Sequence, residues 1–201
     1  MLKPIVFYFD FSSPYAYFAA DKIDHVAMEF GGRDVEWRPF LLGVAMKTTQ
    51  NQPLMHQPVK GEYSVQDWDR MARFMKIPWT LPSKFPIASI VAARAYYWIY
   101  DTDRIVAKEF ARQCLATYFG EGRSIADVDT IGEIGSRVGI DSAELKKAIV
   151  EERIKERLKT ETQEAIDAGV FGSPFFIVDD AKFWGSDRIW MIKRWLKTGG
   201  W

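Results

Sequence analysis

The feature that most constrains the fold is a short apolar run that leads directly into a Ser-Pro helix start. Residues 4–10 predict a fully buried strand, and the segment from Pro14 to Phe30 carries apolar side chains near helical spacing. The next segment, from Val35 to Phe40, alternates as a second strand would. Because the connection between the strands is short and helical, these elements predict two parallel strands joined by a right-handed crossover.

The rest of the chain completes the layout. From Ser64 to about Ala168 the sequence carries helix signals and no convincing strand signal. Strand signals return in residues 175–178 and 181–184, which flank the turn Asp179-Asp180 and precede a final helix. The order is therefore strand–helix–strand, a helical insertion, and strand–strand–helix.

This order predicts an α/β chain with a thioredoxin-like fold (βαβ then ββα) interrupted by an all-helical insertion. We expect residues 1–63 and 169–201 to form the thioredoxin-like domain and residues 64–168 to form the helical insertion domain.

Composition argues against several classes of function. Hydrophobic residues make up 48% of the 201 residues, which is ample for a buried core. Lys plus Arg and Asp plus Glu number 27 each, so no net charge attracts nucleic acid or an anionic membrane. Neither a leader peptide nor a membrane-spanning run is found, and Cys114 is the only cysteine. We expect a cytoplasmic protein with no metal site and no nucleic-acid or membrane partner.

The junction between the first strand and the first helix reads Ser13-Pro14-Tyr15-Ala16. In thioredoxin-like redox proteins this junction carries Cys-x-x-Cys, since a helix N-terminus stabilises a thiolate. Here Ser13 and Ala16 occupy the cysteine positions, which suggests that the sulfur arrives on a ligand, and glutathione is the candidate. The alternative is that Ser13 only caps the helix, with Pro14 at its first position.

A second proline motif, Gly172-Ser173-Pro174, lies immediately before the predicted hairpin. The thioredoxin fold requires a proline there, normally cis, and the backbone of the residue before it is free to pair with a peptide-like ligand. Alone, a proline before a strand marks only an edge. Together with Ser13-Pro14 in the expected order, it indicates a thioredoxin-type ligand site.

Several further motifs spread over nearly the whole chain. They are Phe9-Asp10-Phe11-Ser12-Ser13-Pro14-Tyr15, Gly43-Val44-Ala45-Met46-Lys47 with Asn51 and Pro53, Lys60-Gly61-x-Tyr63, Lys76-Ile77-Pro78, Phe171-Gly172-Ser173-Pro174 and Phe183-Trp184-Gly185-Ser186-Asp187-Arg188. With these motifs the chain resembles the bacterial 2-hydroxychromene-2-carboxylate isomerases, which are relatives of the kappa-class glutathione transferases and, more distantly, of DsbA.

The resemblance implies a glutathione site. Ser13, at the catalytic position, would donate a hydrogen bond to the glutathione sulfur and favour its thiolate over a thiol of pKa ~8.5. The backbone of Ser173 would pair with the cysteinyl part, and its side chain should matter little. The loop Trp184-Gly185-Ser186-Asp187 would receive the γ-glutamyl end, with the Asp187 carboxylate facing the ammonium. Alternatively, Ser186 or Asp187 caps the last helix.

The resemblance also places three residues near the substrate. Lys47 would face a carboxylate of the substrate or of glutathione, and a solvated surface position is an equally good interpretation. Asn51 would contact both glutathione and substrate. Phe85 would lie beside an aromatic substrate.

Taken together, the resemblance implies a glutathione-dependent cis-trans isomerase of the 2-hydroxychromene-2-carboxylate type, acting in aromatic hydrocarbon catabolism. Glutathione would be the cofactor and a small aromatic carboxylate the substrate. The thiolate would add to a conjugated carbon, the bond would rotate, and the thiolate would leave. Two alternatives stay open: a kappa-like glutathione S-transferase that keeps glutathione on the product, and a non-catalytic thioredoxin-like binding module. The resemblance also allows a homodimer.

Overall fold

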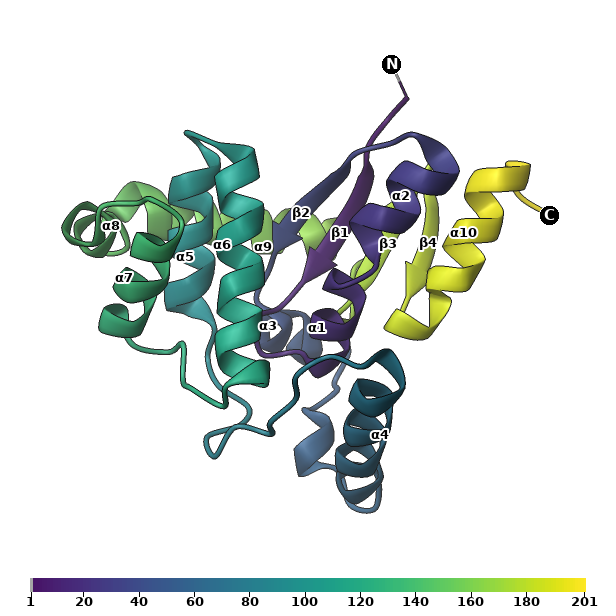
Figure 1. Ribbon diagram of the computed structural model, residues 1–201, viewed down its shortest axis with the longest axis horizontal. Coiled ribbons are helices and arrows are strands. Elements are labelled where there is room, and N and C mark those ends of the chain that lie inside the picture. The colour runs from purple at the N-terminus through teal and green to yellow at the C-terminus, as the bar shows by residue number, and fades with distance from the viewer. Residues whose placement is uncertain (1) are drawn as a thin grey trace.

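A computed structural model describes residues 2–201 and places a four-stranded sheet at the centre of the molecule (Figure 1). The strands, in the spatial order β2-β1-β3-β4, are β1 Ile5–Phe9, β2 Val35–Pro39, β3 Phe175–Val178 and β4 Ala181–Trp184. β1 pairs with β2 in parallel and with β3 in antiparallel register, and β3 pairs antiparallel with β4. The predicted parallel pair and the predicted hairpin are both confirmed.

β1 lies inside the sheet because its side chains are apolar on both faces. Ile5, Phe7 and Phe9 belong to one hydrophobic cluster, and Tyr8 belongs to a second cluster on the opposite face. The first cluster includes Phe176 from β3, whose ring stacks on Phe7 with centroids 5.2 Å apart. The second includes Phe40, which follows β2.

Helices cover both faces of the sheet. The helices of the chain are α1 Pro14–Ala20, α2 Ile23–Gly31, α3 Leu42–Thr48, α4 Lys60–Met75, α5 Ile90–Tyr100, α6 Arg104–Leu115, α7 Val128–Arg137, α8 Ser142–Ala148, α9 Glu152–Asp167 and α10 Ile189–Thr198, with short turns η1 Leu54–His56, η2 Ala116–Gly120 and η3 Ser186–Arg188. α1, α2 and α10 lie on one face and α9 on the other (Figure 1). None of the helices in residues 2–201 is both long and apolar enough to cross a membrane.

The single helix predicted from Pro14 to Phe30 is wrong, since two helices occupy this segment. α1 ends at Ala20, and the Lys22 N–H bonds to the Ala19 carbonyl, three residues back, in a tight turn. The exposed pair Asp21-Lys22 contains neither glycine nor proline, so residue type does not mark the break. α2 ends at Gly31, and Gly32 after it adopts a left-handed φ of 57°, which glycine accommodates readily.

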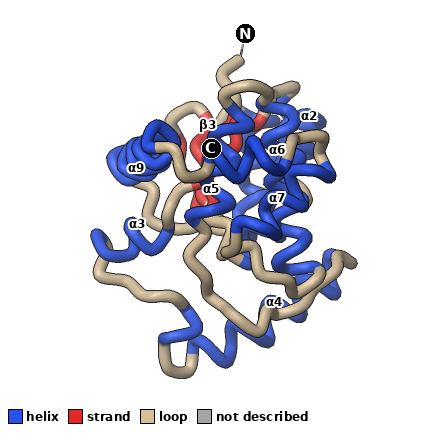
Figure 2. The backbone as a smooth tube through the Cα atoms, turned by 90° about the vertical axis from the view of Figure 1, so that its left-hand side faces the viewer, coloured by secondary structure: helices blue, strands red, loops and turns tan. Residues whose placement is uncertain are grey.

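Most of the helical region packs beside the edge strand β2. Tyr96 and Tyr97 of α5 donate hydrogen bonds from their hydroxyls to the carbonyls of Trp37 and Pro39, each at 2.7 Å. These bonds satisfy carbonyls that an edge strand would otherwise leave unpaired. α4 lies apart from α5–α8, below α1 (Figure 1), and the long loop after α3 leads down to it (Figure 2).

The start of the helical region differs from the prediction. α4 begins at Lys60 rather than at Ser64, and the Ser64 hydroxyl donates to the Lys60 carbonyl at 2.7 Å inside the helix. The boundary expected between residues 63 and 64 therefore falls within α4. The division into two domains stays a prediction.

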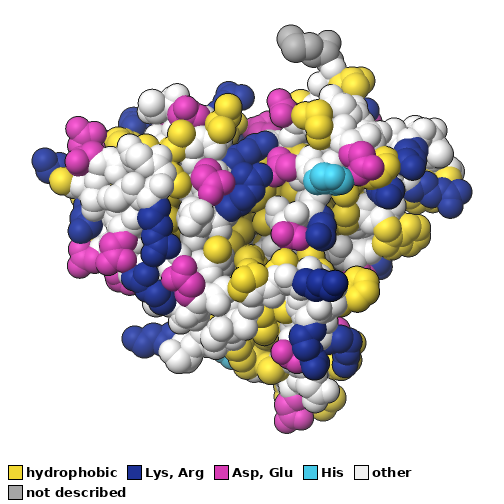
Figure 3. Space-filling view, in the orientation of Figure 1, with side chains coloured by type: hydrophobic (Ala, Val, Ile, Leu, Met, Phe, Trp, Pro, Cys, Tyr) yellow, Lys and Arg dark blue, Asp and Glu magenta, His cyan; other side chains and the backbone are white. Residues whose placement is uncertain are grey.

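On the face seen in Figure 3, side chains of both charges are interspersed, in line with the balanced composition.

Candidate functional site

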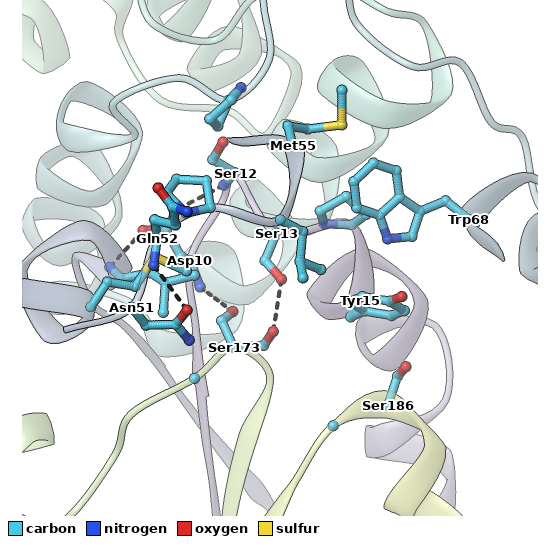
Figure 4. A pocket seen from close by; sticks show the side chains of 18 of the residues that line it. Asp10, Ser12, Ser13, Tyr15, Asn51, Gln52, Met55, Trp68, Ser173 and Ser186 are labelled. Atoms are coloured by element: carbon cyan, nitrogen blue, oxygen red, sulfur yellow. Dashed lines mark hydrogen bonds between the residues drawn. The ribbon is translucent and has the colours of Figure 1, made fainter. Parts of the chain in front are cut away.

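A cavity of about 890 Å³ lies where the C-terminal end of β1 meets the N-terminus of α1. Its walls also include α3, the segment 51–57, α4, residues 85–87, the loop before β3 and the loop after β4. Figure 4 shows Ser13 and Ser173 facing each other, with Asn51 and Gln52 on one side and Tyr15 and Trp68 on the other. The sheet, both proline motifs and α4 therefore contribute to one site.

Ser13 is the N-cap of α1 and is only 4% exposed. Its oxygen accepts a hydrogen bond from the Ala16 N–H at 3.3 Å, and its hydroxyl donates to the Ser173 carbonyl at 2.9 Å. The capping interpretation of Ser13 is thus confirmed. Capping does not exclude a second role, because the same hydroxyl lines the cavity.

The Ser173-Pro174 peptide is cis, as the sequence predicts. The Ser173 side chain matters more than expected: its oxygen accepts a hydrogen bond from the Asp10 N–H at 2.8 Å. This bond ties the end of β1 to the loop before β3 and gives the side chain a structural role, while its minor part in ligand binding stays a prediction. Gly172 is required beside it, since a Cβ there would lie 2.1 Å from Nε1 of Trp184.

The loop Trp184-Gly185-Ser186-Asp187 lines the cavity in full. Neither Ser186 nor Asp187 caps a helix through its side chain, because η3 and α10 both begin without a side-chain cap. The capping alternative for these two residues is therefore wrong. Asp187 instead pairs with Arg188, with Oδ2 and Nη1 2.6 Å apart. Both polar side chains remain available to a ligand.

Of the three predicted substrate residues, two line the cavity. Asn51 and Phe85 are part of the wall, whereas Lys47, exposed in the last turn of α3, is not. Asn51 is held in place by its own loop: its Oδ1 accepts from the N–H of Gln52 at 2.9 Å and from Nε2 of Gln57 at 3.1 Å.

The cations of the cavity wall are Lys60 and Arg188, and the sequence analysis assigned a role to neither. Arg188 is paired with Asp187, whereas Lys60 forms no ion pair within residues 2–201. Lys60 belongs to the motif Lys60-Gly61-x-Tyr63, which was the available signal. Its position in the cavity depends on the path of the loop after α3, which residue types do not reveal.

The α4 side of the cavity is largely apolar. Trp68 and Phe85 meet edge to face, with ring centroids 5.4 Å apart, and methionine and leucine side chains from η1 and α4 surround them. Tyr15 adds one polar group, whose hydroxyl donates to Oδ2 of Asp67 at 3.0 Å. Burial, together with the Asp67 carboxylate, raises the pKa of Tyr15, so its hydroxyl stays protonated at neutral pH.

Asp10 lies beneath the site and was not assigned a role by the sequence analysis. Its Oδ1 accepts from the Ser12 N–H at 2.7 Å and from the Ser89 hydroxyl at 2.9 Å, and its Oδ2 accepts from the Leu42 N–H at 2.8 Å. Burial raises the pKa of this carboxyl, and the three donors partly offset that effect. Asp10 thus positions the segments around Ser13.

The chain supplies no thiol to the cavity within the part that the structure describes. Cys114 is fully buried in the core, outside the cavity wall, and burial raises the pKa of its thiol well above the usual range. No group of three or more His, Cys, Asp or Glu side chains in residues 2–201 could hold a metal ion.

Comparison with known proteins places this geometry in context. The family described as "DSBA-like thioredoxin domain" matches residues 4–197. A "2-hydroxychromene-2-carboxylate isomerase" of Sphingobium xenophagum is 28% identical over 198 residues, which cover 98% of this chain and 99% of that protein. A "Glutathione S-transferase kappa 1" of Caenorhabditis elegans is 27% identical over 203 residues, covering 95% and 89%.

The fold is also shared with a solved structure of a 2-hydroxychromene-2-carboxylate isomerase. The TM-score is 0.86 at 24% sequence identity, and the match covers 96% of this chain and 93% of the other. The predicted thioredoxin-like fold is thereby confirmed.

Proposed function

The chain belongs to the DsbA-like thioredoxin domain family, and we propose that within it this protein is a glutathione-dependent isomerase of the 2-hydroxychromene-2-carboxylate type. One observation carries the proposal. A buried serine, Ser13, occupies the strand-to-helix junction opposite the Ser173-Pro174 loop, and no cysteine lines the cavity in the described residues. The site therefore suits a ligand that carries its own thiol, because the described residues supply none to the cavity.

The donors and acceptors of the cavity fit glutathione. Asp187 and Ser186 suit the ammonium and carboxylate of a γ-glutamyl group, with Trp184 and Gly185 completing that wall. The Ser173 backbone suits the cysteinyl peptide, and Asn51 suits the rest of the tripeptide. At about 890 Å³ the cavity is within the range of small-molecule sites and leaves room for a second ligand.

The remaining residues would hold a small aromatic carboxylate. Phe85 offers an aromatic side chain to a ring, with the buried Trp68 packed edge to face against it, while Lys60 offers a cation to a carboxylate. We propose Lys60 for this role ahead of Lys47, because Lys60 lines the cavity and Lys47 does not. A cytoplasmic location, a place in aromatic catabolism and a homodimer also remain proposals.

In this mechanism Ser13 donates a hydrogen bond to the sulfur and keeps it ionised at neutral pH. When bound, glutathione supplies a nucleophilic sulfur that adds to a conjugated carbon and is released once the bond has rotated. Lys60 and the aromatic residues hold the substrate while this occurs. No histidine lines the cavity within the described residues, and no general base is required, since the reaction begins and ends with a thiolate.

A kappa-like glutathione transferase is the second candidate. It is favoured by a relative of that name that is nearly as similar as the isomerase. The two candidates differ in the fate of glutathione, which an isomerase returns and a transferase retains on its product.

The test first measures whether glutathione binds and then whether the reaction consumes it. Millimolar glutathione should raise the melting temperature by an amount that grows with the logarithm of its concentration over Kd. With 2-hydroxychromene-2-carboxylate in excess over glutathione, an isomerase converts all the substrate while free thiol stays constant. Thiol loss equal to product would identify a transferase. A melting temperature unmoved by glutathione would leave only the binding module.

A further inference from the structure

In this structure the Ser13 hydroxyl already donates a hydrogen bond within the protein. A serine hydroxyl has one proton to donate, and here it goes to the Ser173 carbonyl at 2.9 Å. The oxygen of the same hydroxyl accepts from the Ala16 N–H. Ser13 and Ser173 are only 4% and 9% exposed, and both bonds lie in the wall of the cavity. The hydroxyl cannot donate to a sulfur without giving up the Ser173 carbonyl.

The Ser173 carbonyl has no second donor among residues 2–201. If the Ser13 hydroxyl turned away while a bound ligand without a donor covered this carbonyl, the carbonyl would be left without a hydrogen bond, which is unfavourable. The ligand-free arrangement therefore opposes transfer of the Ser13 hydrogen bond to a thiolate. Some other donor must take over the carbonyl first.

We propose that the amide N–H beside the thiol of the ligand takes over the Ser173 carbonyl and thereby releases the Ser13 hydroxyl to the sulfur. The exchange needs only a rotation about the Cβ–Oγ bond of Ser13, which keeps its proton throughout. The thiol proton leaves to solvent. The inference rests on the proposed function, because it assumes that a thiol of the glutathione type occupies the cavity.

The consequence is a coupling between recognition of the peptide and activation of the sulfur. A thiol with an amide N–H at the cysteinyl position is acidified on binding. A thiol that lacks this N–H is acidified less, because Ser13 stays on the Ser173 carbonyl. The Ser13–Ser173 pair would thus restrict activation to cysteinyl amides and leave simple thiols unreactive.

The test compares glutathione with an analogue in which an ester oxygen replaces the cysteinyl N–H. Each thiol is titrated free and at saturation with protein, by the ultraviolet absorbance of the thiolate. The pKa of bound glutathione should fall by about one unit or more further than that of the bound analogue, a tenfold difference in ionisation, because the α1 N-terminus acts on both thiols and the Ser13 hydroxyl on glutathione alone. An equal fall for both ligands would overturn the inference.

Ser13→Ala supplies the control. Without the hydroxyl, glutathione and the ester analogue should show the same shift on binding, and a difference that persists in Ser13→Ala would contradict the proposed role of Ser13. If glutathione itself shows no binding or no pKa change with the unmodified protein, the proposed function fails rather than this inference.

A second pair of ligands keeps the test decisive if the ester analogue binds too weakly to saturate. N-acetylcysteamine and 2-mercaptoethyl acetate differ only in the N–H that an ester oxygen replaces. Their binding is measured by competition against glutathione. A thiol that is acidified on binding binds more tightly as pH rises towards its free pKa, by proton linkage. We expect a stronger pH dependence for N-acetylcysteamine than for 2-mercaptoethyl acetate, and the same dependence for both would overturn the inference.

Discussion

Oδ2 of Asp10 accepts a hydrogen bond from the Leu42 N–H at 2.8 Å and so fixes the end of β1 to the start of α3. The other carboxylate oxygen accepts from Ser12 and from Ser89, which precedes α5. One buried side chain thus holds three segments that meet around the cavity. This relationship makes Asp10 a positioning residue whose loss should be visible in stability and in its pH dependence.

We expect Asp10→Asn to destabilise the fold. An amide nitrogen would face at least one of the three donors, and a buried donor left unsatisfied costs about 1–3 kcal/mol. The pH dependence has a definite sign. Burial raises the folded-state pKa of Asp10, so its contribution to stability is full below the unfolded pKa of about 3.9 and is lost as pH rises through the folded pKa.

Urea unfolding of both proteins across this pH window tests the prediction. The stability advantage of the unmodified protein over Asp10→Asn should shrink as pH rises. An advantage that stays constant or grows would show that burial does not govern the ionisation of Asp10.

Gly185 should be needed for ligand binding as well as for the turn. Its φ is +108°, and a Cβ there would lie 2.4 Å from Oδ1 of Asp187. We expect Gly185→Ala to lower stability by about 1–2 kcal/mol and to weaken glutathione binding about tenfold, because Asp187 is displaced. Gly32→Ala is the control: φ is +57° there, and nothing lies within 4 Å of the added carbon. Calorimetry should show unchanged glutathione affinity for Gly32→Ala. An unchanged affinity for Gly185→Ala would show that Asp187 does not contact glutathione.

Lys60→Ala and Lys47→Ala separate the two candidate cations. Lys60 lines the cavity but is exposed, so its loss should raise KM for an aromatic carboxylate about threefold, within the 0.2–1 kcal/mol of exposed ion pairs. The effect should be larger at low salt. Lys47→Ala should leave KM unchanged. A larger rise in KM for Lys47→Ala than for Lys60→Ala would show that Lys47 is the residue that contacts the substrate.

Features of the fold that depend on neighbouring residues could be predicted from the sequence. The hairpin turn at Asp179-Asp180 is an example, since both residues adopt the positive φ, 49° and 72°, that tight hairpin turns require and Asp tolerates. The two proline motifs are likewise local signals. One motif follows the apolar strand β1 and the other precedes the apolar strand β3, and the antiparallel pairing of these two strands brings the motifs together.

Features that depend on the path of the chain could not be predicted. α4 follows Val59, whose φ of 65° is rare for a β-branched residue, so residue type does not mark the helix start. The same loop decides that Lys60, and not Lys47, lines the cavity. The sequence analysis assigned no role to Asp10, because Leu42 and Ser89, which donate hydrogen bonds to its carboxylate, are remote in sequence.

The central claim is that Ser13 stabilises the thiolate of bound glutathione. Ser13→Ala should lower stability by about 1 kcal/mol, because the Ala16 N–H loses its cap. It should also raise the pKa of bound glutathione by roughly one to two units, since one hydrogen bond to a charged group is worth about 1.5–3 kcal/mol. Asp103→Ala, which removes the cap of α6 outside the cavity wall, controls for the lost cap.

The most direct measurement is the ultraviolet titration of the thiolate of bound glutathione in the unmodified protein, Ser13→Ala and Asp103→Ala. The account predicts an upward shift of the pKa in Ser13→Ala alone, with Asp103→Ala matching the unmodified protein. An unshifted titration in a folded Ser13→Ala variant that still binds glutathione would contradict it.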